Sequence, residues 1–171
     1  MMHLKSIFLP LIIILAILYQ ACQTSTEQKK ETEETPGLEQ SITGVWENVS
    51  LTVDIESKAG IPDSTDRFEV PAGHWEDILQ IKPIRTTYLG DSTFTSVYRD
   101  LNDSVVHTTS GEWFVKKDTL YLVSEGVTSG YHTVVKSDTG TFTGYLDWDQ
   151  DSIPDDLYTG VQRKISGEPS H

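Results

Sequence analysis

Between residues 41 and 166, short runs rich in Val, Ile, Thr, Tyr, Phe and Trp alternate with Gly, Asp, Asn and Ser, and no stretch has a sustained helical period. β-Branched and aromatic residues favour strands, and the small polar residues between them favour tight turns. This pattern predicts an all-β fold of antiparallel strands with one long loop at residues 55–74. The eight predicted strands are residues 43–54, 75–88, 92–100, 104–116, 119–125, 131–137, 141–147 and 157–165.

Strands joined in order by short hairpins fit an eight-stranded up-and-down barrel, because closing the sheet removes its unpaired edges. A two-sheet β-sandwich fits the same strands, so both architectures stay open at this point. An eight-stranded barrel is either filled by its own side chains or admits one small ligand. An apolar internal cavity of at least about 300 Å³ would favour ligand binding over a purely structural role.

The acidic composition excludes several classes of function. The 171 residues include 26 acidic and 13 basic side chains, which give a formal net charge of −13. Nucleic-acid binding depends on Lys and Arg that neutralise phosphates, so we expect no nucleic-acid partner. The one cysteine, Cys22, excludes an internal disulfide, a CxxC redox pair and a Cys-rich zinc site.

Side chains that could carry catalysis are sparse. The sequence contains no GxSxG or SxxK nucleophile motif, and His74, His107 and His132 lie in separate predicted strands and loops. Zinc needs three or four convergent ligands, and the spacing of these histidines does not suggest convergence. We therefore expect a protein that is not an enzyme, and we expect it to be a monomer.

The first residues predict a secretory signal peptide. The apolar run Ile7–Leu18 is shorter than the roughly 20 residues that a membrane-spanning helix needs. Leu18-Tyr19-Gln20-Ala21-Cys22 resembles the lipobox of bacterial lipoproteins, with Tyr19 and Gln20 departing from the residues that the family prefers. The resemblance implies that Cys22 is acylated with diacylglycerol and becomes the first residue of the mature chain. An ordinary secretion signal with an incidental cysteine is the alternative.

These features divide the chain into four parts. Residues 1–21 form the predicted signal peptide, residues 22–40 the acylated cysteine and a disordered tether, residues 41–166 the β domain, and residues 167–171 a flexible tail. The tether is too polar to bury the surface that folding requires. By analogy with Gram-negative lipoproteins, Gln23 after the cysteine implies a lipid anchor in the outer membrane, on its periplasmic or surface face. The implied location is the bacterial cell envelope.

Short motifs in the β domain carry a second resemblance. Gly44-Val45-Trp46 opens the first predicted strand, and Arg163 lies near the end of the last one. This arrangement resembles the Gly-X-Trp motif and terminal arginine of lipocalins, and Gly111-Glu112-Trp113 with the hairpin after it is similar to bacterial lipocalin-like lipoproteins. The resemblance implies a lipocalin-like barrel in which Arg163 packs across Trp46 at the closed end, and in which a small hydrophobic ligand is held.

The side-chain alternation of the first and last strands sets a condition on this resemblance. Trp46 falls on the same face as Asn48, away from Leu51, so either a bulge in the first strand brings both apolar residues inside or the fold is a different one. In the last strand, Arg163 shares a face with three apolar residues and would need a carboxylate or an aromatic ring as its partner. These apolar residues are Leu157, Val161 and Ile165.

The sharpest local signal is the acidic segment 147–156. Counting Asp147 as position 1, carboxylates occupy positions 1, 3, 5 and 9, which resembles the calcium loops of EF-hand and thrombospondin type-3 repeats. Position 6 is Ser152 where those loops have glycine, and position 12 is Tyr158 where they have a bidentate acid. The predicted weak, structural Ca²⁺ site comprises Asp147, Asp149, Asp151, the Ile153 carbonyl and Asp155, with Asp156 as a supplement. A solvated acidic turn is the alternative.

Two functions follow from the sequence. The first is a membrane-anchored, lipocalin-like lipoprotein that binds a small apolar molecule in its barrel. The second is a surface module with a structural or interaction role, stiffened by calcium and without a small-molecule ligand. An apolar cavity inside the barrel would favour the first function, and a solidly packed interior would favour the second.

Overall fold

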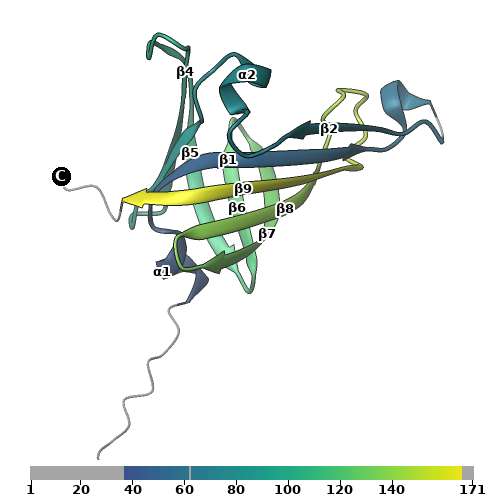
Figure 1. Cartoon of the computed structure of the whole chain (residues 1–171). Helices are drawn as coiled ribbons and strands as arrows, with labels where there is room; N and C mark the ends of the chain where they lie inside the picture. Colours follow the sequence, from purple (N-terminus) through teal and green to yellow (C-terminus); the bar gives the residue numbers. More distant parts are fainter. Residues whose placement is uncertain (1–36, 62, 167–171) are drawn as a thin grey trace, which may run out of the picture. The chain divides into compact units, whose positions relative to one another are not determined.

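The computed structural model describes residues 37–61 and 63–166. The predicted signal peptide, Cys22, most of the tether and the tail at 167–171 lie outside these residues. The predicted all-β barrel is confirmed, because eight antiparallel strands close into an up-and-down barrel (Figure 1). The elements are α1 (Leu38–Ile42), β1 (Gly44–Ile55), η1 (Lys58–Gly60), β2 (Asp66–Val70), α2 (Trp75–Leu79), β3 (Arg85–Tyr88), β4 (Thr93–Arg99), β5 (Val105–Lys116), β6 (Thr119–Ser124), β7 (Val127–Lys136), β8 (Thr139–Leu146) and β9 (Asp156–Ser166).

The pairing of β1 with β9 closes the barrel and excludes the sandwich. Each strand from β3 to β8 pairs with the next one along the chain, and β9 pairs with β1 from Val45 to Asp54. The other edge of β1 is shared by two strands: Gly44–Glu47 pairs with β3, and Leu51–Ile55 pairs with β2. β2 is therefore a ninth strand that extends the sheet beyond the barrel wall (Figure 1).

The segment between β1 and β3 differs from its prediction. The predicted strand 75–88 contains the helix α2 and only four strand residues, β3, while the predicted loop 55–74 contains β2. Glu76 and Asp77 lie in the first turn of α2, where acidic side chains interact favourably with the helix dipole, and Pro83 cannot donate a sheet hydrogen bond. Phe68 and Val70 give β2 the alternation of a half-buried strand.

Of the two explanations for the faces of Trp46 and Leu51, the bulge in β1 is the one that the structure shows. Its register against β9 shifts between Asn48 and Ser50, which adds one residue to β1 and changes the phase of its side chains. Trp46 is buried before the bulge, and Leu51 and Val53 are buried after it. The bulge thus lets one strand supply the interior at both ends of the barrel.

The buried apolar residues form two clusters, one towards each end of the barrel. The cluster at the α1 end contains Trp46, Tyr88, Phe94, Trp113, Leu120, Phe142 and Ile42. The second cluster, next to β2 and α2, contains Leu51, Val53, Ile55, Val70 and Trp75. The space between the two clusters is the part of the interior that apolar side chains do not fill.

The helix α1 covers one end of the barrel (Figure 1). Ile42 is fully buried, and its carbonyl accepts a hydrogen bond of 2.6 Å from Trp46 Nε1. Leu38 packs against the same cluster. The last residues of the predicted tether, 38–40, therefore belong to the folded domain.

The described residues, 37–61 and 63–166, belong to one compact unit, and every barrel pairing lies inside it. With both apolar clusters also inside it, this unit has what a domain needs to fold on its own. No helix among the described residues is long and apolar enough to span a membrane.

Candidate functional site

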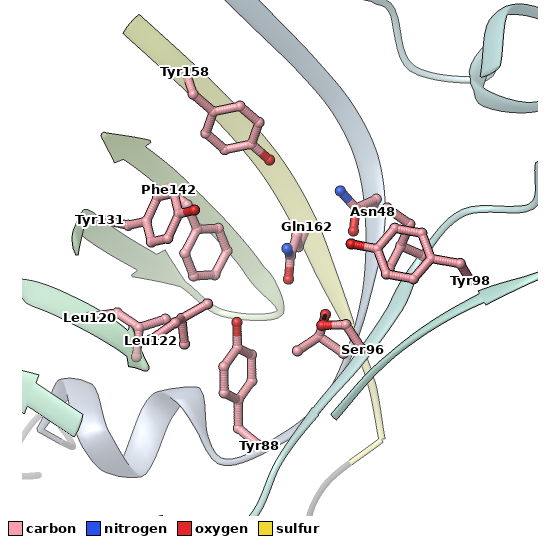
Figure 2. Close-up of a pocket in the computed structure, with 12 residues that line it drawn as sticks. Asn48, Tyr88, Ser96, Tyr98, Leu120, Leu122, Tyr131, Phe142, Tyr158 and Gln162 are labelled. Carbon is pink, nitrogen blue, oxygen red and sulfur yellow. Dashed lines mark hydrogen bonds between the residues drawn. The ribbon is translucent and has the colours of Figure 1, made fainter. Parts of the chain in front are cut away.

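A cavity of about 140 Å³ lies in the barrel interior (Figure 2). Its wall comes from β1, β3, β4, β6, β7, β8 and β9, together with the residue before β3. The lining residues are Asn48, Ile84, Thr86, Tyr88, Ser96, Tyr98, Leu120, Leu122, Tyr131, Phe142, Tyr158 and Gln162. Residues from seven strands thus converge on one internal space.

Tyrosine hydroxyls dominate the polar part of this wall. In Figure 2, the side chains of Tyr88, Tyr98, Tyr131 and Tyr158 direct their hydroxyls towards the space beside Gln162. The four tyrosines come from β3, β4, β7 and β9, so no local sequence motif joins them. Their rings supply apolar surface, and their hydroxyls can both donate and accept hydrogen bonds.

One polar atom of the wall is left without a partner. Gln162 is 9% exposed, and its Oε1 is buried with no hydrogen-bond donor among the described residues. Thr86 and Ser96, by comparison, satisfy each other through a 2.8 Å hydrogen bond. A buried amide oxygen without a donor costs about 1–3 kcal/mol, so this position favours a bound water or ligand that donates to it.

A glycine in β9 makes room for one of the hydroxyls. Gly160 lies between Tyr158 and Gln162 on the inner face, and a Cβ at this position would overlap the Tyr158 hydroxyl. The Tyr158 side chain therefore lies along β9, with its hydroxyl next to Gly160, instead of pointing straight across the barrel. The missing side chain of Gly160 sets where this hydroxyl enters the cavity.

The cavity carries no charge near neutral pH. Tyrosine is the only ionisable residue type in its wall, and desolvation by burial raises the pKa of Tyr88, Tyr131 and Tyr158 above the ordinary value of 10. These three hydroxyls therefore stay protonated, and the wall contains no Asp, Glu, Lys, Arg or His side chain that would face a ligand.

This interior differs from the expected one in size and polarity. The cavity is smaller than the roughly 300 Å³ of an ordinary ligand pocket, and polar groups occupy much of its wall. The inner face of β9 is also the opposite of the predicted one: Tyr158, Gly160 and Gln162 point inward, and Leu157 and Val161 lie at the alternate, outward positions. The tyrosines and Gln162 were missed because strand alternation alone does not say which face is enclosed.

The motif residues of the lipocalin resemblance occupy the closed end. Gly44 and Trp46 are buried, and the ring of Trp46 lies edge-on to Phe142 with 6.1 Å between centroids. The cation over Trp46 is Lys164, with its Nζ 5.4 Å from the ring centroid. Arg163 is exposed and lies 3.8 Å from the Glu47 carboxylate on the outer surface. The structure thus gives Lys164 the position that the resemblance gives to Arg163.

The acidic segment between β8 and β9 brings three predicted ligands together. One carboxylate oxygen each from Asp147, Asp149 and Asp151 lie within 4.8 Å of one another, a grouping that could hold a metal ion. Ser152, at position 6 of the predicted loop, has a φ of 74°, the left-handed conformation for which calcium loops use glycine. The Ile153 carbonyl accepts a hydrogen bond from the Asp155 backbone N–H.

Asp156 has a different role from the predicted one. Its side chain is fully buried, and one carboxylate oxygen accepts the N–H of Glu56 while the other accepts those of Trp148 and Asp149. It lies outside the group of three aspartates that could share an ion. Asp156 therefore joins the acidic segment to the end of β1 and does not supplement the ion site.

No protein-family model matches the chain, and no curated protein matches it either.

Proposed function

We propose that this chain is a lipid-anchored, lipocalin-like protein of the bacterial cell envelope that holds a small molecule inside its barrel. The observation that carries the proposal is the internal cavity, into which four tyrosine hydroxyls and the unpartnered Gln162 Oε1 are directed. A barrel serving only as a structural module would gain stability from an apolar filling at this level. The cavity is smaller than the roughly 300 Å³ apolar space that would favour an apolar ligand, so the proposal rests on the polar wall, which a bound molecule with matching hydrogen bonds would explain.

Binding without catalysis is the activity that this wall supports. A general acid or base works best with a pKa near the operating pH, and burial moves the tyrosine pKa values further from neutrality. The remaining polar lining groups are amides and hydroxyls with no charged group beside them. These groups can position a molecule but have no means of activating it.

A substitution that fills the cavity tests whether a ligand binds there. Ser96 points into the cavity and Thr95 is its outward neighbour in β4, so Ser96→Leu fills the space while Thr95→Leu adds the same bulk outside. We expect a set of small one-ring compounds to shift the methyl NMR signals of Leu120 and Leu122 in the wild type and in Thr95→Leu. Ser96→Leu should abolish the shifts. Equal shifts in all three proteins would place binding elsewhere and contradict the proposal.

The membrane anchor rests on Cys22 at the end of the predicted signal peptide. Several acyl chains on this residue would hold the protein at a membrane, at about 0.8 kcal/mol per buried CH₂. We expect the wild type to partition into the detergent phase and Cys22→Ser to stay in the aqueous phase or unprocessed. Aqueous partitioning of both proteins would contradict the anchor.

A second candidate function is a weak structural Ca²⁺ site in the acidic segment. The three grouped aspartates and the left-handed Ser152 favour it. Without a bidentate acid at position 12, we expect a Kd in the range of about 10⁻⁴–10⁻³ M. At ten times the Kd, binding adds about 1.4 kcal/mol of stability and raises the melting temperature by about 3–6 °C.

The test is a calcium titration of thermal unfolding on the wild type and on two variants. The double variant Asp149→Asn, Asp151→Asn should lose the calcium-dependent shift, whereas Asp63→Asn, in an exposed loop, should keep it. The segment is a solvated turn without a bound ion if millimolar calcium shifts all three proteins equally or shifts none of them.

A further inference from the structure

We infer that the barrel selects a neutral molecule about the size of one six-membered ring, carrying a hydrogen-bond donor that reaches Gln162 Oε1. This inference rests on the proposed function and names the chemical class of its ligand. Size, charge and hydrogen bonding each restrict the class independently.

The volume restricts the ligand to a single ring. The cavity of about 140 Å³ is close to the roughly 150 Å³ of an engineered protein cavity that accepts benzene. Fatty acids, sterols and other long apolar molecules are too large to lie wholly within this volume. Aromatic walls from Phe142, Tyr131 and Tyr158, the last two packed edge-to-face with centroids 6.0 Å apart, favour a flat ring.

The absence of ionic groups in the cavity wall restricts the charge of the ligand. A carboxylate or an ammonium entering this space would lose its hydration and find only amides and neutral hydroxyls. Burying a charge without a counter-charge is strongly unfavourable. A neutral molecule enters without this loss of charge hydration, so the cavity favours neutral ligands.

The unpartnered amide oxygen restricts the hydrogen bonding. Gln162 Oε1 accepts no hydrogen bond from the described residues, so a ligand O–H or N–H directed at it satisfies a buried acceptor. The hydroxyls of Tyr88 and Tyr158 lie on the same space and can donate to the ligand's own oxygen or nitrogen (Figure 2). A purely apolar ring would cover these groups without replacing their bonds to water.

Four probes of similar size separate these requirements: phenol, toluene, benzoate and benzylammonium. We expect NMR titration of residues 35–171 to show phenol binding with at least tenfold higher affinity than toluene, and no binding of either ion in the cavity. Toluene binding as tightly as phenol, or either ion binding more tightly, would overturn the inference and leave the proposed function intact. Failure of all four probes would overturn both.

The hydrogen-bonding partner is tested with variants of matched size. Gln162→Met keeps the side-chain length and removes the amide, so phenol should bind at least fivefold more weakly and toluene at least as tightly as before. Gln40→Met, on the exposed face of α1, serves as its control. An unchanged phenol affinity in a folded Gln162→Met protein would overturn the role of this residue.

A second variant keeps the test valid if Gln162→Met does not fold. Tyr88→Phe removes one hydroxyl and preserves the ring that packs against Trp113, with 5.7 Å between centroids. We expect phenol binding to weaken severalfold in Tyr88→Phe and to stay unchanged in Tyr145→Phe, where the tyrosine is 66% exposed on the outer surface. Equal phenol affinities in the two variants would contradict a polar cavity that binds through its hydroxyls.

Discussion

Lys164 and Arg163 are neighbours in β9, yet strand alternation places their side chains in different environments. Lys164 turns to the inner face, where its Nζ lies over Trp46 and donates a 2.8 Å hydrogen bond to the Ser41 carbonyl. Arg163 turns outward to Glu47, which also pairs with Arg85 at 2.9 Å. The inner cation ties β9 to the residue before Ile42 in α1, while the outer one belongs to an exposed ion-pair group.

We predict that Lys164→Met destabilises the domain more than Arg163→Met does. Loss of the contact with Trp46 and of the bond to Ser41 should cost about 1–2 kcal/mol. The exposed pair of Arg163 should be worth about 0–1 kcal/mol, because water and salt screen it. Urea unfolding of both variants gives the comparison. Equal losses would show that the position over Trp46 adds nothing beyond a surface ion pair.

At the scale of elements, β9 combines barrel closure with the shaping of the cavity. Its pairing with β1 closes the barrel, and its inner face presents Tyr158, Gly160 and Gln162 to the cavity. The bulge in β1 lies opposite this stretch, between Asn48 and Ser50. The polar wall therefore sits where the register of the two closing strands changes.

We predict that Gly160→Ala moves the Tyr158 hydroxyl out of its place in the cavity. The added methyl overlaps this hydroxyl, and overpacking of this kind costs about 1–3 kcal/mol. Urea unfolding measures the loss, and the phenol affinity reports the change in the cavity. Gly37→Ala is the control, since a Cβ there has no heavy atom within 4 Å. A variant as stable as the wild type, with unchanged phenol binding, would contradict this account of the glycine.

At the scale of the whole molecule, buried tyrosines link stability to pH. Tyr88, Tyr131 and Tyr158 have pKa values raised by burial above the ordinary value of 10. Above that pH the unfolded chain releases their protons and the folded domain retains them, so the folded state binds more protons. Stability is therefore complete below about pH 10 and falls as the pH rises further.

We predict a loss of about 1.4 kcal/mol per pH unit for each of Tyr88 and Tyr158, whose pKa values burial raises most, with Tyr131 acting in the same direction. Burial lowers the pKa of Lys164 from 10.5, which acts in the opposite direction, but only below the unfolded value. Urea unfolding between pH 8 and pH 11.5 measures the slope above pH 10, and Tyr88→Phe should reduce it by about 1.4 kcal/mol per pH unit. A slope that the variant leaves unchanged would mean that other groups control the alkaline transition.

The sequence by itself determined the hairpin succession from β4 to β9. Thr93–Arg99, Thr119–Ser124 and Thr139–Leu146 lie within two residues of their predicted bounds. Strand residues and turn residues act through nearby backbone, so local composition carries this information. The spacing of Asp147, Asp149 and Asp151 likewise predicted a grouping that the structure forms, since one short loop contains all three.

Only the tertiary structure decided which faces are enclosed. The inward positions of Tyr158 and Gln162 depend on the register of β9 against β1, and a shift by one residue would exchange the two faces of the strand. The same register gives Lys164, not Arg163, to Trp46. The cavity needs side chains from strands far apart in the chain, so no local pattern could have revealed it. Its chemistry follows from how the barrel closes, because closure sets which alternate residues meet inside.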